Sequence, residues 1–111
     1  MSRPQFIVQT NAVPGREAEF DKWYTDRHLS DVLAVPGFVA AQRYVMSHTQ
    51  RDEIAAAYPY RHLAVYELDD DPQAALDNLK AAVADGLYLS PAMEPDRKMV
   101  VYDPVTDRVT S

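Results

Sequence analysis

The chain has 111 residues, of which 47% are hydrophobic and 25% charged, a composition typical of one globular domain covering residues 1–111. Its net charge of −6 argues against nucleic-acid binding and against an anionic membrane surface, because both depend on basic side chains. The absence of cysteine excludes disulfides, thiolate catalysis and cysteine-ligated metals. No apolar run approaches the length of a membrane span, so a soluble, cytoplasmic protein is expected by default.

The first half of the chain predicts a strand, a helix and a second strand. Residues 5–10 (QFIVQT) are rich in β-forming side chains and predict the first strand. Apolar residues then recur at helical spacing over residues 14–33. Pro36 and Gly37 predict that this helix ends before them, and residues 38–46 (FVAAQRYVM) predict the second strand.

The second half predicts the order strand, helix, strand. Residues 60–68 (YRHLAVYEL) form the clearest strand pattern in the chain. The acidic residues 69–71 before Pro72 signal a helix start, Gly86 closes that helix, and residues 98–102 (KMVVY) predict the last strand. The order β-α-β-β-α-β is that of α+β ferredoxin-like folds, in which both helices cover one face of a four-stranded antiparallel sheet.

The sheet face without helices is predicted to line a cavity or a homodimer interface. Side chains alternate along a strand, which predicts one shared face for each of two sets: Phe38, Ala40, Gln42 and Tyr44, and His62, Ala64, Tyr66 and Leu68. Neither face of either strand has the polar composition of a solvated surface. Apolar walls with a few polar groups suit a pocket, and an aromatic surface suits a dimer interface. A dimer that encloses a pocket satisfies both interpretations.

Four segments of the chain carry a family pattern. They are residues 14–20 (PGREAEF), the Trp23-Tyr24-x-x-x-His28-Leu29 motif, residues 32–38 (VLAVPGF) and residues 62–68 (HLAVYEL). Together with the acidic helix start, they resemble the dimeric α/β-barrel superfamily, and within it the EthD-like branch. The resemblance implies a ferredoxin-like monomer that pairs with a second copy, so that two sheets form a barrel with a pocket in each subunit. The superfamily includes polyketide cyclases, monooxygenases, isomerases, haem enzymes and proteins without known activity, so the fold does not fix the function.

His28 and Tyr24 are the candidate catalytic residues. Phe20, Tyr24 and His28 follow one another at intervals of four and therefore lie on one helical stripe. An imidazole titrates near neutral pH, so His28 is predicted to act as general acid or base. The alternative is a structural histidine that bonds to a carbonyl or pairs with Asp26 or Asp31. The family motif matches His28, Tyr24 and their aromatic surroundings.

The candidate substrate-binding residues are Trp23, Gln42, Tyr44, His62 and Tyr66. His62 and Tyr66 share a strand face, and if Gln42 and Tyr44 face the same cavity, four polar groups converge there. Such a set could orient an aromatic or polyketide-like substrate. The alternative is that tyrosines are ordinary strand formers.

No metal or cofactor is expected. The three histidines have no metal-ligand spacing, and the sequence has no nucleophile elbow, phosphate loop or dinucleotide fingerprint. With three glycines in the chain, none of these glycine-rich loops can be built.

The predicted function is cofactor-independent proton transfer (cyclase, isomerase or lyase) on an aromatic or polyketide-like molecule, in a homodimer, as in the catabolism of aromatics. The alternatives are a cofactor-free monooxygenase, a non-catalytic ligand-binding or accessory protein using the same pocket, and a structural dimer with a closed interior. Turnover on aromatic compounds separates enzyme from binder.

Overall fold

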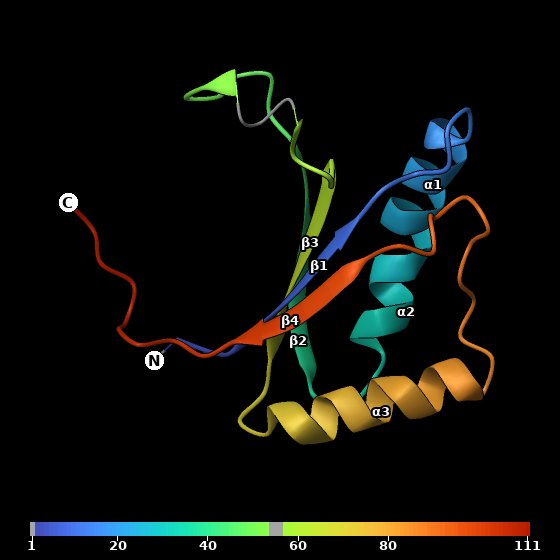
Figure 1. Ribbon diagram of the computed structural model, residues 1–111. Helices are drawn as coiled ribbons and strands as arrows, with labels where there is room; N and C mark the ends of the chain where they lie inside the picture. Colours follow the sequence, from blue (N-terminus) through green and yellow to red (C-terminus); the bar gives the residue numbers. More distant parts are fainter. Residues whose placement is uncertain (1, 54–56) are drawn as a thin grey trace.

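A computed structural model of the protein describes residues 2–53 and 57–111 and has the predicted order of elements (Figure 1). The strands are β1 (Gln5–Thr10), β2 (Phe38–Val45), β3 (His62–Leu68) and β4 (Lys98–Tyr102). The helical segments are α1 (Glu17–Trp23), η1 (Tyr24–His28), α2 (Leu29–Leu33) and α3 (Pro72–Ala84). The strands form one antiparallel sheet in the order β2-β3-β1-β4, which confirms the α+β ferredoxin-like fold.

The helices lie on one side of this sheet, and the other side carries no helix (Figure 1). Along β1, Phe6, Val8 and Thr10 are buried, while the residues between them are half-buried. We call the side of Phe6 and Val8 the helix face. We call the opposite side the open face, and its strand residues are Gln5, Ile7, Gln9, Ala40, Gln42, Tyr44, Leu63, Val65, Glu67, Lys98, Val100 and Tyr102.

An irregularity near the start of β2 changes which residues share a face. Phe38 pairs with Leu68, and Ala40, two residues later, pairs with Glu67, which is only one residue away from Leu68 in β3. Val39 is therefore an extra residue in β2 without a partner in β3. Such a bulge interrupts the alternation of side chains. The prediction that Phe38 shares a face with Ala40, Gln42 and Tyr44 is therefore wrong, because Phe38 packs in the core of the helix face.

The first helical region is continuous from residue 17 to residue 33 but contains one turn of π-helix. Within η1 the backbone N–H of Leu29 donates to the carbonyl of Tyr24, five residues earlier, instead of four. A regular helix was predicted here. π turns are rare and occur often at functional sites, and this one contains both predicted catalytic residues, Tyr24 and His28.

The start of α3 packs tightly against the turn before β2. Asp71 caps the helix by accepting a hydrogen bond from the Ala74 backbone N–H at 3.0 Å, and Pro72 occupies the first turn, as predicted. Gly37 has a φ of +100°, and a Cβ there would lie 2.6 Å from the Cβ of Ala75. This close contact holds the N-terminal end of α3 against the turn before β2.

Candidate functional site

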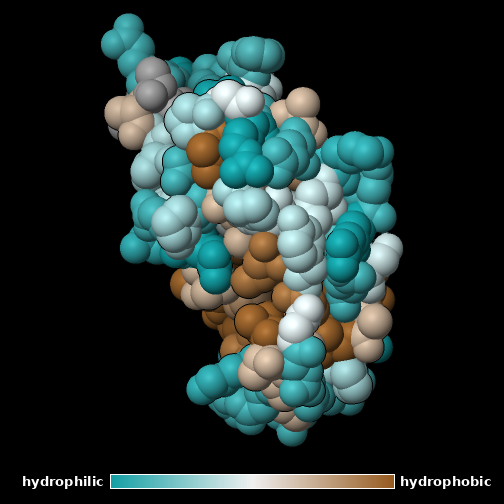
Figure 2. Space-filling view, turned by 90° about the vertical axis from the view of Figure 1, so that its right-hand side faces the viewer, coloured by the Kyte–Doolittle hydropathy of each residue, from teal (hydrophilic) through white to brown (hydrophobic). Residues whose placement is uncertain are grey.

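An apolar cavity lies on the helix face, between the sheet, the η1–α2 region and α3. Its volume of about 440 Å³ is in the range of small-molecule sites. Figure 2 shows hydrophobic side chains gathered on the side of the molecule that it views. The apolar residues that line the cavity are Phe6, Val8, Val32, Leu76, Leu79, Val83, Leu87, Leu89, Met93 and Met99.

The position of this cavity corrects the sequence analysis, which placed the pocket on the helix-free face. The alternation of β3 was interpreted correctly, because Ala64, Tyr66 and Leu68 are all buried on one face. That face is the helix face, however, and the helices stand far enough from the sheet to leave room for a ligand. The open face carries shallow hollows instead, one of which includes Gln42 and Tyr44.

Five polar side chains line the cavity: Tyr24, His28, Tyr66, Lys80 and Arg97. They come from η1, β3, α3 and the residue before β4. Among the described residues, no aspartate or glutamate lines it. The cavity thus combines apolar walls with hydroxyl, imidazole and cationic groups.

Tyr24 and Tyr66 form a buried pair of phenols. The Tyr66 hydroxyl donates a hydrogen bond to the Tyr24 hydroxyl, with an oxygen–oxygen distance of 3.2 Å. Burial raises the pKa of both side chains, and their mutual contact raises that of Tyr66 further. Both therefore remain protonated at neutral pH. Because Tyr24 accepts from Tyr66, its own proton is available to a group in the cavity.

His28 lies beside this pair in an aromatic cage. Its ring stacks on Trp23, with centroids 4.4 Å apart, and meets Tyr24 edge to face at 4.8 Å. Burial lowers the pKa of His28 to about 4, and the charge of Arg97 acts in the same direction. The imidazole is therefore neutral at pH 7. Its Nδ1 atom is fully buried and has no hydrogen-bond partner among the described residues.

The contacts expected of a structural His28 are not present in the described part of the chain. Asp26 pairs with Lys22 at 3.1 Å, and Asp31 pairs with Arg27 at 3.3 Å. Asp31 influences His28 through its charge alone. A buried nitrogen without a partner is unusual in a folded protein, and the indole nitrogen of Trp23 is a second such atom among the described residues.

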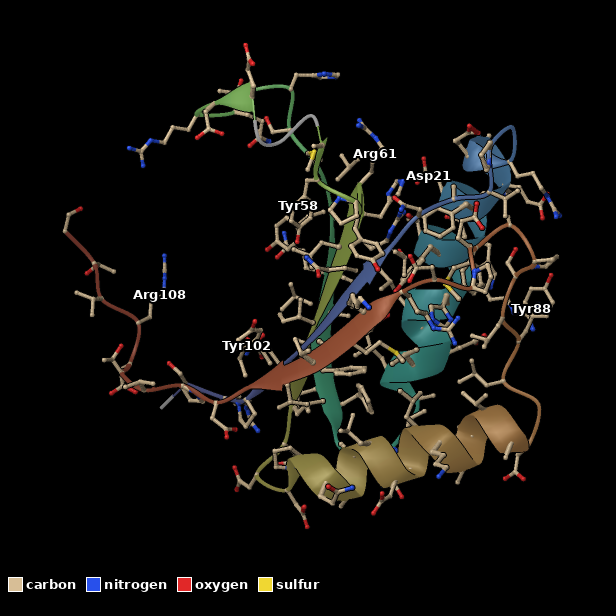
Figure 3. All side chains as sticks on the ribbon, in the orientation of Figure 1. Asp21, Tyr58, Arg61, Tyr88, Tyr102 and Arg108 are labelled. Carbon is tan, nitrogen blue, oxygen red and sulfur yellow. The ribbon has the colours of Figure 1, made fainter. Side chains whose placement is uncertain are left out.

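Trp23 does not line the cavity, but its ring stacks on the imidazole of His28, which does. It also contacts Phe20 and Tyr88, with centroids 6.2 and 6.4 Å away. Tyr88 lies in the connection after α3 (Figure 3), and the guanidinium of Arg27 lies 4.6 Å from the centre of its ring. These contacts fix the Trp23 ring, and through it the orientation of His28.

His62 belongs to a neighbouring polar cluster around Arg43. The Arg43 guanidinium contacts Asp21 at 3.0 Å, Thr25 at 2.7 Å and Nδ1 of His62 at 3.4 Å. Asp21 projects from α1 toward the upper end of the sheet (Figure 3). Burial lowers the pKa of His62, and the positive charge of Arg43 lowers it further. Arg43 also lies 4.8 Å from the centre of the Tyr24 ring, which connects this cluster to the cavity.

Of the predicted site residues, the structure brings together Tyr24, His28 and Tyr66 around one cavity. His62 and Trp23 lie next to these residues but outside the cavity lining, and Gln42 and Tyr44 lie on the open face. The four polar groups predicted to converge, those of Gln42, Tyr44, His62 and Tyr66, therefore do not line one cavity.

Sequence reasoning missed Lys80 and Arg97, although both carry a signal. Lys80 interrupts the apolar stripe of α3, since Leu76, Leu79 and Val83 surround it at helical spacing. Arg97 precedes β4 by one residue and alternates with Met99, which lines the same cavity.

Residues 2–53 and 57–111 contain no group of three or more histidine, aspartate or glutamate side chains placed to hold a metal ion. No helix in this described part of the chain is long and apolar enough to cross a membrane.

The fold is similar to that of several solved structures. MhuD from Mycobacterium tuberculosis, a haem degrader with two haems in its active site, has a TM-score of 0.66 and 18% identity, over 96% of this chain and 99% of MhuD. An EthD family protein from Bacillus halodurans has a TM-score of 0.62 and 16% identity, over 93% and 99% of the two chains. The ActVA-Orf6 monooxygenase of Streptomyces coelicolor, in complex with nanaomycin D, has a TM-score of 0.57 and 16% identity, over 99% and 94%.

The chain therefore has the ferredoxin-like fold of these proteins, as the sequence predicted. At identities below 20%, these likenesses concern the fold alone. No protein-family model matches the sequence, and no curated protein matches it.

Proposed function

We propose that this protein is an enzyme that transfers a proton on a small aromatic or polyketide-like substrate, with His28 as the base. The observation that carries this proposal is a neutral imidazole beside two neutral phenols in an apolar cavity. A neutral imidazole can accept a proton at pH 7, and the Tyr24 hydroxyl, which accepts from Tyr66, can donate a hydrogen bond to an oxyanion. These are the two requirements for removing a proton next to a carbonyl or from a phenol.

The proposed reaction begins when His28 takes a proton from a C–H or O–H bond of the substrate. Because Nδ1 is enclosed, Nε2 is the nitrogen that exchanges this proton. The electron pair moves onto the substrate oxygen, where the Tyr24 hydroxyl donates a hydrogen bond to the developing charge. A pKa of about 4 makes His28 a weak base in the free protein, but an oxyanion nearby favours the protonated imidazole. His28 then returns the proton to another atom, which completes a cyclisation, isomerisation or elimination.

The substrate class follows from the walls of the cavity. They are apolar, and a volume of about 440 Å³ suits a molecule with a few fused rings. ActVA-Orf6 offers a parallel, since its structure holds nanaomycin D. A cofactor-free monooxygenase is a variant of the same proposal, because removing a proton from an electron-rich phenol would also prepare it to react with oxygen.

The test is turnover of a panel of aromatic and polyketide-like compounds by the wild-type protein and by His28→Gln. We expect the variant to lose about 10²- to 10⁴-fold in kcat, the usual contribution of a general base. His48→Gln is the control, because His48 is exposed and does not line the cavity. Full activity in His28→Gln would contradict the proposal. A collapse of its melting temperature would instead support a structural histidine.

Haem is the second candidate, because the donor set of the cavity also fits it. A neutral imidazole could ligate iron, and Lys80 and Arg97 could pair with the propionates. Bound haem would supply oxygen activation. Titration of the protein with haem, followed by visible absorption, distinguishes the two candidates. A stoichiometric complex that His28→Gln abolishes would favour haem, whereas no complex would leave the cofactor-independent reaction.

We further propose that two copies pair through their open faces. Val100 and Tyr102 are about half exposed or more there, beside the half-buried Ile7, Leu63 and Val65. After Tyr102, the last residue of β4, residues 103–111 extend away from the sheet and include Arg108 (Figure 3). A protein of this fold from Thermobifida fusca is described as dimeric, at a TM-score of 0.56 and 17% identity.

A cytoplasmic location remains a prediction.

A further inference from the structure

The charged side chains that line the cavity are both cationic. Lys80 lines it from α3 and Arg97 from the residue before β4, and no described carboxylate lines the cavity with them. The chain as a whole has 17 acidic residues against 11 basic ones. Finding only cations among the charged lining residues is therefore the opposite of what the overall composition favours, and it favours a negatively charged ligand.

Arg97 is the more informative of the two cations because it is half-buried and unpaired. It makes no hydrogen bond or ion pair with any residue that the structure describes, whereas five other basic side chains each contact a carboxylate: Arg3, Arg16, Lys22, Arg27 and Arg43. Its neighbour in the sequence, Asp96, accepts a hydrogen bond from the Tyr60 hydroxyl at 3.1 Å instead. Removing a guanidinium from water without a partner is unfavourable, so this arrangement suits a ligand that supplies the anion.

We propose that the substrate is an apolar carboxylic acid whose carboxylate pairs with Arg97, with Lys80 as the second cation. This inference rests on the proposed function and narrows its substrate class. A guanidinium offers two parallel N–H donors to a carboxylate, which fixes the orientation of the bound acid. The apolar body of the molecule then lies against the side chains of α3, including Leu76 and Leu79.

The same pairing connects binding to the reaction. Arg97 is near enough to Tyr24 and His28 for its charge to act on both of them. In the free protein this positive charge opposes protonation of His28. A bound carboxylate neutralises it, so the imidazole becomes a stronger base once an acidic substrate is present. A neutral analogue of the substrate would lack this effect.

The experiment compares 2-naphthoate with 2-naphthamide, its neutral analogue of the same size, by calorimetric titration. We expect the carboxylate to bind about 10- to 100-fold more tightly, as a charge-assisted hydrogen-bonded pair allows. Arg97→Gln should remove most of the preference for 2-naphthoate, with Lys80 accounting for the remainder, and should leave the affinity for 2-naphthamide unchanged. Arg97→Lys should retain part of the preference. Arg61→Gln is the matched control, because Arg61 is exposed and does not line the cavity.

The outcomes separate this inference from the proposed function. Equal affinities for the two compounds in the wild-type protein overturn the acid preference and leave proton transfer by His28 in place. An unchanged preference in Arg97→Gln overturns the assignment to Arg97. No binding of either compound overturns the cavity as a site for aromatic ligands, and with it the proposed function. Circular dichroism of each variant confirms that it is folded before titration, and Lys80→Gln gives a second variant on a separate element.

Discussion

The two faces of the sheet have similar compositions but different surroundings. Tyr66 and Tyr44 illustrate the difference, because both are strand tyrosines, yet Tyr66 is 1% exposed on the helix face and Tyr44 is 47% exposed on the open face. On β3, the residues that alternate with Tyr66 are only half-buried. The comparison shows that aromatic content does not identify the face with the cavity. What distinguishes the two faces is that the helices cover one of them and leave a cavity between themselves and the sheet.

The largest expected effect is the contrast between Tyr66→Ala and Tyr44→Ala. Tyr66→Ala removes a fully buried ring from the core and should lower the free energy of unfolding by about 3–5 kcal/mol. Tyr44→Ala removes a ring that is exposed in the single chain and should lower it by under about 1 kcal/mol when the protein is monomeric. Urea unfolding of both variants, at a protein concentration below the dimer dissociation constant, measures this. Equal losses would contradict the difference in burial between the two faces.

The next effect is on the pH dependence of stability. The pKa of His28 is lowered to about 4 by burial, while the unfolded chain has a value near 6.5. Between these values the unfolded state binds more protons, so stability falls as the pH is lowered from 6.5 to 4. The loss due to His28 is up to about 3 kcal/mol.

Unfolding measured across this pH range in the wild type and His28→Gln isolates that contribution. His28→Gln should have the shallower dependence, and His48→Gln should follow the wild type, since His48 is exposed. A steep dependence that His28→Gln retains would show that other groups cause it, among them His62, whose pKa is also lowered by burial.

A charge at the centre of the open face tests the proposed dimer. Val65→Asp places two unpaired carboxylates in the expected interface and should raise the dimer dissociation constant at least about 100-fold. Sedimentation velocity measures the change. Ala74→Asp is the control, because Ala74 is exposed near the start of α3, on the outer surface. A dimer that persists in Val65→Asp would assign the interface to another surface.

The smallest effect concerns single hydroxyl groups. Tyr24→Phe leaves the buried Tyr66 hydroxyl without its acceptor and should lower the free energy of unfolding by about 1–2 kcal/mol. Tyr102→Phe, on the open face, should change it by less than about 0.5 kcal/mol in the monomeric protein, because Tyr102 is 63% exposed in the single chain. Thermal unfolding of the two variants provides the comparison, and equal shifts would argue against a buried pair.

The strands and helices could be predicted because their signals are local. Residues 5–10 and 98–102 form strands as expected, and Asp71 and Pro72 start α3. The faces could not be predicted as reliably, because one extra residue at Val39 changes the alternation along β2. A bulge depends on how the neighbouring strand packs, and no local pattern signals it.

The candidate site was predicted in part for the same reason. Tyr24 and His28 lie one helical turn apart, so their proximity follows from local geometry. Arg97 is 69 positions after His28, and only the folded sheet brings it to the same cavity. The side of the sheet that holds the cavity depends on the distance between the layers, which the sequence pattern does not contain.

The π turn at η1 has a consequence for how the site and the fold can vary separately. It amounts to one additional residue in an otherwise regular helix, since Leu29 bonds five residues back while α1 and α2 on either side are regular. A chain lacking that residue could form an unbroken α-helix whose two ends still face the sheet. The residue corresponding to His28 would then no longer contact Trp23 and Tyr24 as it does here. Loss of a single codon could therefore remove the site and preserve the domain, which makes the length of this helix a more sensitive marker of function than its composition.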